Sequence, residues 1–412
     1  MVNCVFVRCP GCQDIIMLRL SVGYANRQPF YYVCNKCKCA TRGALIVDFE
    51  KVELKLDLEA GEILDSDVDA DQIYTFDPNL PTRSDAKSMM DPGGSPFLFT
   101  YSILGESIVE YQTRCKTYLD VIKQDWLNLK RLTNFYLNSN WERFDALYKE
   151  IMNENLNEHP IWVRVDILYR LYDLIAIQMM PHPYYVEMKS EWNSFLLPKG
   201  INKKAISNYQ DTIIIDSEYI ELRISLFNCL EQYIECGEIL LSGLAVEMYP
   251  MPLENYGDLR IYRDEFPVLR DLYVQAFEAC HHALTFIVEL INVVKRGNPI
   301  SYCGQPEIKK LPNNRKQFNR QTSQQKAFYL RELPVWNSAW HHTLDRTLRN
   351  KIGHRLIHHD LISGNLVRSG EPPIPYIVLV AKTQRLIYPL VSCLNALKIV
   401  EIHNIMRSMK ST

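Results

Sequence analysis

The spacing of apolar residues divides this chain into a strand-rich beginning and a long helical remainder. Apolar and polar residues alternate at positions 44–56, as they do in strands that bury one face, and positions 15–20 and 30–33 are also predicted to form strands. From residue 106 onward, apolar residues recur every three or four positions, which is the spacing of amphipathic helices. The pattern therefore predicts a mainly α protein with a small β region at its N-terminus.

The helical part is interrupted by polar segments that contain proline and glycine. Helices are predicted within residues 106–192 and over residues 216–249, 264–295, 341–362 and 376–409. Residues 297–325 have no apolar periodicity and are expected to form a mobile loop or lid. Four long helices with irregular connections predict a C-terminal helical bundle.

Changes in composition set the expected domain boundaries. Between residues 51 and 91 there are eleven Asp and Glu against four Lys and Arg. Aspartates alternate from Asp65 to Asp71, but the glycine and terminal glutamate of a calcium-binding loop are missing, which favours a solvated linker. We expect a β region at 1–57, an acidic linker at 58–105, a helical middle region at 106–200 and a helical bundle at 201–412.

Two CxxC motifs, separated by 21 residues, lie in the β region. Zn²⁺ in structural sites is held by four soft donors, and each CxxC turn supplies two of them. The motifs predict a zinc ribbon with a structural zinc and no open coordination position, hence no catalysis there. Buried free thiols or a redox pair are the alternatives, and Cys4 or Cys39 is near enough to replace a ligand. The predicted ligands are Cys9, Cys12, Cys34 and Cys37.

Composition excludes several classes of protein. With 47% hydrophobic and 23% charged residues, the 412-residue chain is expected to fold into two or three domains. Residues 1–20 lack the layout of a secretion signal, and the apolar runs are too short to span a bilayer, so we expect a soluble, cytoplasmic protein. Its twelve cysteines are then thiols or metal ligands rather than disulfides.

The predicted helix at 341–362 combines an apolar stripe with a polar motif. Five of the ten histidines fall in nineteen residues here, and Asn350 and His354 share a helix face at i,i+4. Residues 295–355 contain thirteen Lys and Arg against three acids, as expected where a polyanion approaches. The stripe itself consists of Leu344, Leu348, Ile352 and Leu356.

Arg349, Asn350 and His354 resemble the signature of the HEPN superfamily, in which a histidine follows an arginine after four to six residues. The resemblance covers residues 216–412, under half of the chain. It implies a metal-independent endoribonuclease that acts as a homodimer and leaves 2′,3′-cyclic phosphate ends. Such domains cleave tRNA or other host RNA in bacterial toxin–antitoxin and abortive-infection systems, so a phage-derived trigger or an antitoxin is an expected partner.

The residue types suit this chemistry. An imidazole titrates near neutral pH, so His354 is the candidate base, and the guanidinium of Arg349 suits phosphate oxygens. Asn350 would orient the imidazole or bind the phosphate. Three alternatives stay open: a surface ion pair between Asp345 and Arg349, a metal held by neighbouring histidines, and a non-catalytic module that binds nucleic acid or protein. No phosphate-binding glycine loop, dinucleotide fingerprint or hydrolase elbow is present.

Overall fold

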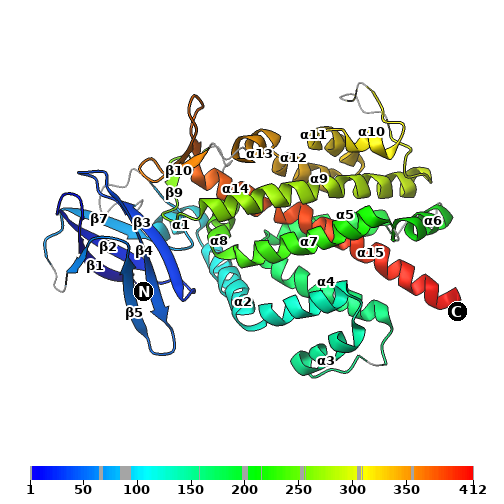
Figure 1. Cartoon of the computed structure of the whole chain (residues 1–412), viewed down its shortest axis with the longest axis horizontal. Helices are drawn as coiled ribbons and strands as arrows, with labels where there is room; N and C mark the ends of the chain where they lie inside the picture. The colour runs from blue at the N-terminus through cyan, green and yellow to red at the C-terminus, as the bar shows by residue number, and fades with distance from the viewer. Residues whose placement is uncertain are drawn as a thin grey trace. The chain divides into compact units, whose positions relative to one another are not determined.

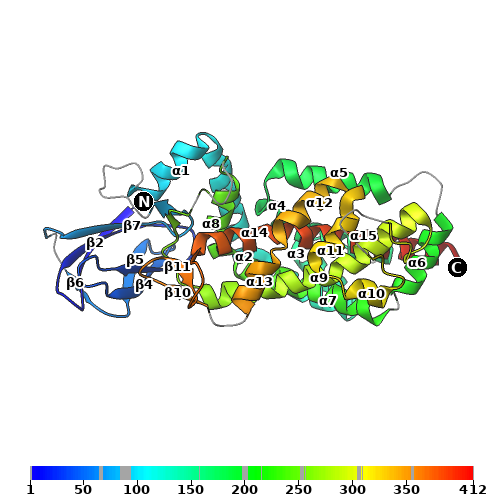
Figure 2. The same cartoon turned by 90° about the horizontal axis from the view of Figure 1, so that it is seen from above.

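The computed structural model describes residues 2–64, 68–83, 94–156, 158–196, 203–214, 216–250, 255, 257–303, 308, 310–353 and 357–411. It is 60% helical with small β-sheets near the N-terminus, so the predicted mainly α fold class is confirmed. The helices and strands are labelled in Figure 1 and seen from above in Figure 2. The chain divides into two compact units, each made of three stretches. Unit 1 is Met1–Asp120, Cys236–Asp271 and Lys351–Gln384, and unit 2 is Val121–Glu235, Leu272–Asn350 and Arg385–Thr412.

Two sheets form the N-terminal part of unit 1. The four-stranded sheet has the order β6-β1-β2-β7, and the three-stranded antiparallel sheet has the order β3-β4-β5. Strands β1 and β2 form an antiparallel hairpin, whereas β7 pairs with β2 in parallel. The predicted strands are confirmed here. Their bounds are β1 Val2–Arg8, β2 Ile15–Ser21, β3 Arg27–Val33, β4 Ala40–Asp48, β5 Glu53–Leu58, β6 Glu62–Leu64 and β7 Gln72–Phe76.

These two sheets share one hydrophobic core. Ile16, Leu18 and Leu20 occupy alternate positions of β2 and are buried, because successive side chains of a strand point to opposite faces. Phe30 of β3 and Leu45 of β4 belong to the same buried cluster. The core also contains two of the CxxC cysteines, Cys9 and Cys34.

The segment predicted to be an acidic linker carries regular structure. Strand β6 pairs with β1, and β7 extends the other edge of the same sheet by pairing with β2. Phe76 of β7 is buried in the shared core. Helix α1 (Pro96–Leu104) starts after Ser95, whose hydroxyl accepts a hydrogen bond from the amide of Leu98. The linker prediction was therefore wrong for these elements, although residues 65–67 and 84–93 lie outside the described residues.

The rest of unit 1 consists of helices and small sheets. Glycine is required at the start of α8, because a Cβ at Gly237 would lie 1.6 Å from the Tyr118 hydroxyl oxygen. Helix α8 therefore approaches α2 too closely for any side chain at this position. The remaining elements are α8 Gly237–Glu247, the first part of α2 Ser107–Leu137, β8 Thr82–Arg83, β9 Leu259–Arg260, β10 His358–Asp360, β11 Asn365–Val367, β12 Ile374–Pro375 and α14 Tyr376–Arg385.

Among its described residues, unit 2 contains helices and connecting segments but no strand. Helix α15 packs against α4, α5, α6 and α7. The predicted boundary between residues 200 and 201 thus does not separate two compact units, since α4 and α15 belong to the same one. Unit 2 contains α3 Trp141–Met152, α4 Ile161–Gln178, α5 His182–Leu196, α6 Lys203–Ile214, α7 Ser217–Glu235, most of α9 Phe266–Arg296, α10 Arg315–Asn319, α11 Ser323–Ala327, a 3-10 turn Phe328–Glu332, α12 Pro334–Thr343, most of α13 Arg346–Gly353, and α15 Ile387–Ser411.

A buried carboxylate joins four helices in the core of unit 2. Glu401 of α15 accepts hydrogen bonds from three tyrosine hydroxyls and forms an ion pair with Arg223 at 3.0 Å. A charge inside a protein is costly unless it is paired and hydrogen-bonded, and here both conditions hold. The three tyrosines are Tyr136 of α2, Tyr169 of α4 and Tyr219 of α7.

The single helix predicted at 341–362 is wrong. Helix α12 ends at Thr343, and α13 begins at Arg346 because the carboxylate of Asp345 accepts a hydrogen bond from the Leu348 amide at 2.9 Å. After Gly353 the described chain resumes in strand β10, which pairs with β11. The apolar stripe is buried at Leu344, Leu348 and Ile352, and Leu356 lies outside the described residues.

Residues predicted to form a mobile loop also contain structure. Helices α10 and α11 lie within or at the end of residues 297–325, and each is capped at its N-terminus by a side chain. Phe318 of α10 is fully buried and stacks on Tyr302, with ring centroids 4.8 Å apart. This packing anchors the segment, so the prediction of a lid without regular structure was wrong for α10 and α11.

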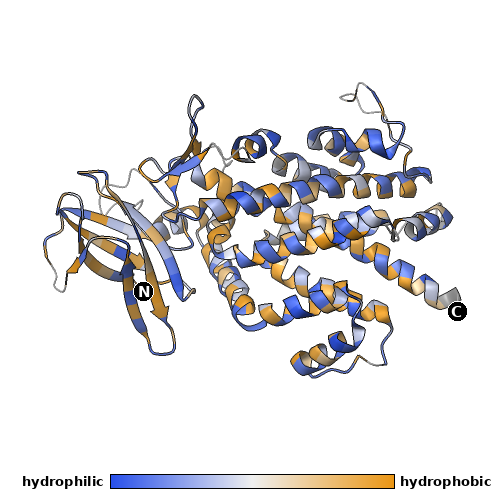
Figure 3. Cartoon of the chain, in the orientation of Figure 1, coloured by the Kyte–Doolittle hydropathy of each residue, from blue (hydrophilic) through white to orange (hydrophobic). Residues whose placement is uncertain are grey.

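Two helical stretches, Phe266–Arg296 and Tyr376–Met409, are long and apolar enough to cross a membrane by length and composition alone. In their most apolar windows, 78% and 83% of the residues are buried inside the protein. Apolar and polar residues are interleaved along both stretches (Figure 3). Core helices of soluble proteins have the same properties, so this composition is only a weak sign of a membrane span.

Candidate metal centre and candidate basic site

The four cysteines of the CxxC motifs come together in unit 1. Their sulfur atoms all lie within 4.8 Å of one another. Cys9 and Cys12 occupy the turn of the β1–β2 hairpin, and Cys34 and Cys37 occupy the turn of the β3–β4 hairpin. Each of the two sheets therefore supplies one pair of cysteines.

The two turns have the same backbone geometry. The amide of Gln13 donates to the carbonyl of Cys9 at 3.0 Å, and the amide of Lys38 donates to that of Cys34 at 2.9 Å. Gln13 and Lys38 both adopt the left-handed conformation, with φ of 65° and 60°. A Cβ at Gly11 would lie 2.9 Å from the Cys37 sulfur, so this position of the first turn has no room for a side chain.

Hydrogen-bond donors surround the Cys34 sulfur. Burial opposes ionisation of this thiol, but backbone amides of Cys37 and Lys36 and the Gln72 side chain together lower its pKa to about 6. The Gln72 amide nitrogen lies 3.4 Å from the sulfur, and its oxygen accepts from the Asn35 amide at 2.7 Å. Sequence reasoning missed Gln72 because it lies in the segment interpreted as a linker. The signal available in the sequence was the pair of β-branched residues Ile73 and Thr75 among aromatic residues, which is a composition that strands favour.

The sulfur positions fit a tetrahedral metal. Sulfurs 2.3 Å from a central Zn²⁺ would be separated from one another by about 3.8 Å. The Cys9–Cys37 and Cys12–Cys34 separations are both 3.5 Å, within the same range. Cys4, which is exposed, and Cys39 are not among the four. The cluster can hold a metal ion, and the structure brings together the same four cysteines that the sequence singled out.

The residues of the Arg/His motif are only partly described. Arg349 and Asn350 lie on α13, whereas His354 lies outside the described residues. The Arg349 guanidinium forms an ion pair with Glu278 of α9 and donates to the Asn350 side chain at 3.3 Å. The alternative of a surface ion pair between Asp345 and Arg349 is not what the structure has: Asp345 caps α13, and the guanidinium pairs with Glu278.

Two neighbouring histidines lie on a strand and not on the long helix that the sequence predicted. His358 and His359 belong to strand β10 in unit 1. His359 is buried, stacks on Tyr376 at 4.2 Å, and contacts the Asp264 carboxylate through Nδ1 at 3.0 Å. Although burial opposes it, His359 and Arg42 lower the pKa of Asp264. His359 therefore has a packing role in unit 1.

Sequence reasoning missed the histidine that lies near the basic residues of unit 2. Burial, followed by the charges of Lys326, His282, Arg349 and Arg346, lowers the pKa of His281 to about 4. Its Nε2 lies 3.4 Å from the Lys326 ammonium. The adjacent histidines at positions 281 and 282 were visible in the sequence, but α9 was interpreted only from its apolar stripe.

The geometry thus provides two candidate sites, a four-sulfur cluster in unit 1 and a basic group around His281 in unit 2. The first can bind a soft metal cation, and the second can attract an anion. Comparisons of this chain with known protein families, with curated proteins and with solved structures find no match.

Proposed function

We propose that Cys9, Cys12, Cys34 and Cys37 hold one structural Zn²⁺. The observation that carries this proposal is the convergence of four sulfur atoms from two hairpin turns, one in each sheet. Thiolate ligands favour zinc over hard cations, and four protein ligands leave no coordination position for a substrate. The ion would tie the two sheets together and has no catalytic role.

Metal analysis of the purified protein tests this assignment. We expect one zinc per chain in the wild type and none in Cys34→Ser. Cys39→Ser is the matched control, because Cys39 lies next to the cluster without belonging to it, and it should retain the metal. A wild-type protein purified under reducing conditions that contains no zinc and takes up none would contradict the proposal.

As a second candidate, we propose that residues 201–412 contain a metal-independent endoribonuclease centre of the HEPN type, with Arg349, Asn350 and His354. The observation that favours it is the gathering of Arg346, Arg349 and Lys326 around His281, which makes this region attractive to RNA. Its target would be tRNA or another host RNA, and its context bacterial defence or a toxin–antitoxin pair. The resemblance further implies a homodimer, and the sequence features described above favour a cytoplasmic location.

In this reaction, His354 takes the proton from a ribose 2′-hydroxyl. The 2′-oxygen attacks the adjacent phosphorus, the bond to the 5′-oxygen breaks, and that oxygen takes a proton from water while the imidazolium returns its proton to the solvent. Arg349 stabilises the charge on the phosphoryl oxygens. The products are a 2′,3′-cyclic phosphate and a 5′-hydroxyl.

The ion pair between Arg349 and Glu278 favours the alternative, a non-catalytic module that binds nucleic acid or protein. A guanidinium already neutralised by a carboxylate is less available to a phosphate. If Glu278 holds Arg349 in a structural role, Glu278→Gln destabilises the protein. If Glu278 only restrains a catalytic arginine, the same substitution increases cleavage.

Cleavage of a tRNA pool without added metal, followed by analysis of the product ends, separates these possibilities. Removing a catalytic group should lower the rate by at least about 100-fold, so His354→Ala and Arg349→Ala should both be inactive. Glu278→Gln should cleave faster than wild type if Glu278 restrains a catalytic arginine. Equal cleavage by wild type and His354→Ala would rule out His354 as the base, and absence of cleavage in all variants would favour the binding module.

A further inference from the structure

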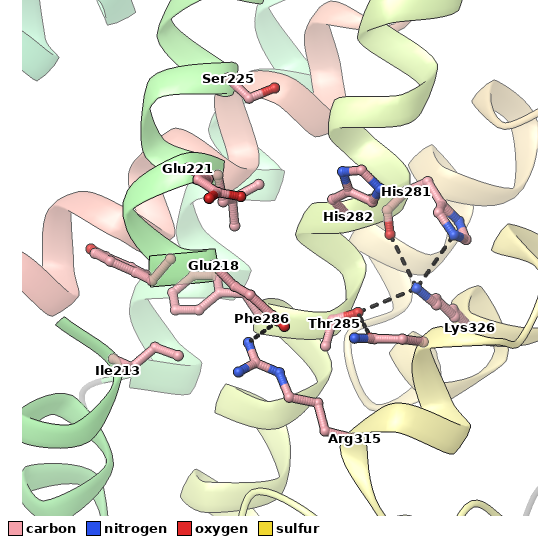
Figure 4. A pocket seen from close by; sticks show the side chains of 13 residues that line it. Ile213, Glu218, Glu221, Ser225, His281, His282, Thr285, Phe286, Arg315 and Lys326 are labelled. Carbon is pink, nitrogen blue, oxygen red and sulfur yellow. Dashed lines mark hydrogen bonds and ion pairs between the residues drawn. The ribbon is translucent and has the colours of Figure 1, made fainter. Parts of the chain in front are cut away.

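A cavity of about 460 Å³ lies in unit 2, lined by residues of α7, α9, α10 and α11 (Figure 4). This volume falls in the range of about 300–1,000 Å³ that is usual for small-molecule sites. His281 and Thr285 come from α9, and Lys326 comes from α11. The cavity is therefore large enough for a small ligand and combines residues from separate parts of the chain.

Lys326 is a buried cation that has no counter-ion within the part of the chain that the structure describes. It is only 1% exposed, and its ammonium lies 3.3 Å from the Thr285 hydroxyl and 3.4 Å from Nε2 of His281. Among the described residues, no carboxylate forms an ion pair with it. Burial lowers its pKa to about 8, so it is still mostly protonated at pH 7. A buried charge of this kind is costly unless something of opposite sign compensates it.

The Lys326 ammonium also donates to the His281 carbonyl at 3.5 Å, so its hydrogen-bond partners are all uncharged, and the unused donor of this group is on His281. Because an ammonium can only donate, Nε2 of His281 accepts the hydrogen bond from Lys326, which places the imidazole proton on Nδ1. This Nδ1 is buried and has no hydrogen-bond partner. Arg346 and Arg349 add positive charge around the ring. Within the described ranges, Lys326 and Nδ1 of His281 therefore have no negatively charged acceptor.

The α7 side of the cavity has the opposite character. Glu218 and Glu221 line it from α7, away from the labelled His281 and Lys326 (Figure 4). Glu218 is partly compensated by Arg315 at 3.4 Å. Carboxylates repel phosphates but accept hydrogen bonds from hydroxyl and amino groups. A matching ligand thus has one anionic end and hydrogen-bond donors at the other.

We propose that this cavity binds a small phosphate monoester of the size of a nucleoside monophosphate. Its phosphate lies against Lys326 and His281, where the ammonium and the Nδ1 proton form charge-assisted hydrogen bonds. Its hydroxyl or amino groups face Glu218 and Glu221. A continuous RNA strand would bring further phosphates to the acidic side, so the site selects a small molecule. The proposal does not rest on RNA cleavage.

Calorimetric titration of the full chain tests it with four probes: inorganic phosphate, adenosine 5′-monophosphate, adenosine, and an RNA oligomer without terminal phosphates. We expect the monophosphate to bind best, inorganic phosphate more weakly and adenosine not at all, whereas any binding of the RNA oligomer should be the same in wild type and in Lys326→Met. Loss of one charge-assisted contact lowers affinity by about 10- to 100-fold, which is the expected effect of Lys326→Met on the monophosphate. Lys316→Met is the control, since Lys316 of α10 is exposed and does not line the cavity.

A second variant separates the two ends of the ligand. Glu221→Gln should weaken the monophosphate but leave inorganic phosphate unchanged. Lys326→Met removes an uncompensated buried charge, so it should fold, which circular dichroism will verify. The proposal is overturned if the monophosphate does not bind at millimolar concentration, if Lys326→Met binds it as well as wild type, or if the RNA oligomer binds in a Lys326-dependent way while the monophosphate does not.

Discussion

The cysteine cluster of unit 1 and the His281–Lys326 group of unit 2 are polar sites of opposite sign. Four sulfurs within 4.8 Å of one another carry negative charge when ionised, and they can bind a cation. Lys326 carries a buried positive charge that no described carboxylate neutralises, and it calls for an anion. Glu401 shows a third situation, in which Arg223 and three tyrosines already satisfy a buried carboxylate.

The difference lies in what neutralises each buried charge. Glu401 has an ion pair and hydrogen bonds within its own chain, and we interpret it as part of the core. The four sulfurs and Lys326 have no partner of opposite charge among the described residues, and we interpret them as binding sites. Burial of a charge is therefore informative about function only together with an account of its partners.

We expect removal of the metal to have the largest effect on the stability of the protein. Structural zinc contributes about 10–16 kcal/mol in small domains, so treatment with a strong chelator, or Cys34→Ser, should unfold the two-sheet part of unit 1. Hydrogen exchange should show loss of protection in β1 to β4. Cys39→Ser should keep that protection. Unchanged exchange in the metal-free protein would mean that the shared core, not the metal, holds the sheets.

The next prediction compares how the free energy of unfolding changes when a paired buried charge, Glu401, and an unpaired one, Lys326, are removed. Glu401→Ala leaves Arg223 buried without its partner and should lower the free energy of unfolding by about 3–5 kcal/mol. Lys326→Met should instead raise it by about 1–3 kcal/mol, because an unpaired charge is removed. Urea denaturation followed by tryptophan fluorescence measures both, with the exposed Glu187→Ala as control. If both substitutions changed the free energy of unfolding in the same direction, Glu401 and Lys326 would not differ in how their charges are compensated.

The smallest effect is on the protonation of His281. Its pKa of about 4 in the folded protein lies below the ordinary 6.5. Between these values the unfolded chain binds a proton that the folded protein does not, so this group makes stability fall as the pH falls from 6.5 to 4. Above pH 6.5 it has no effect. Proton NMR of the imidazole should give a low pKa, which rises in Lys326→Met; titration near 6.5 in the wild type would contradict the burial of His281.

Local sequence signals were sufficient for the first site and not for the second. Each CxxC motif forms a turn whose hydrogen bonds lie within five residues, as from Gln13 to Cys9, so its structure follows from short-range chemistry. His281 and Lys326 are 45 residues apart and meet only because α9 and α11 pack together. Periodicity describes which face of a helix is apolar, but not which distant side chain will cover it.

The incorrect predictions have similar causes. Strand β7 was missed because its partner, β2, lies about fifty residues earlier in the chain, and pairing rather than propensity decides a strand of this kind. The helix at 341–362 was predicted from an apolar stripe, and its residues Leu344, Leu348 and Ile352 are indeed buried. The backbone nevertheless leaves the helical conformation after Thr343. Asp345 caps a new helix, and a single capping residue is a weak signal within a strong periodic pattern.

The Glu401 network has a consequence for synthesis on the ribosome. Tyr136, Tyr169, Tyr219 and Arg223 emerge long before α15, the helix that carries their shared acceptor. Until α15 leaves the exit tunnel, these polar groups have water or a chaperone as their partner. Unit 2 is therefore expected to complete its core late in translation, after α15 has left the exit tunnel.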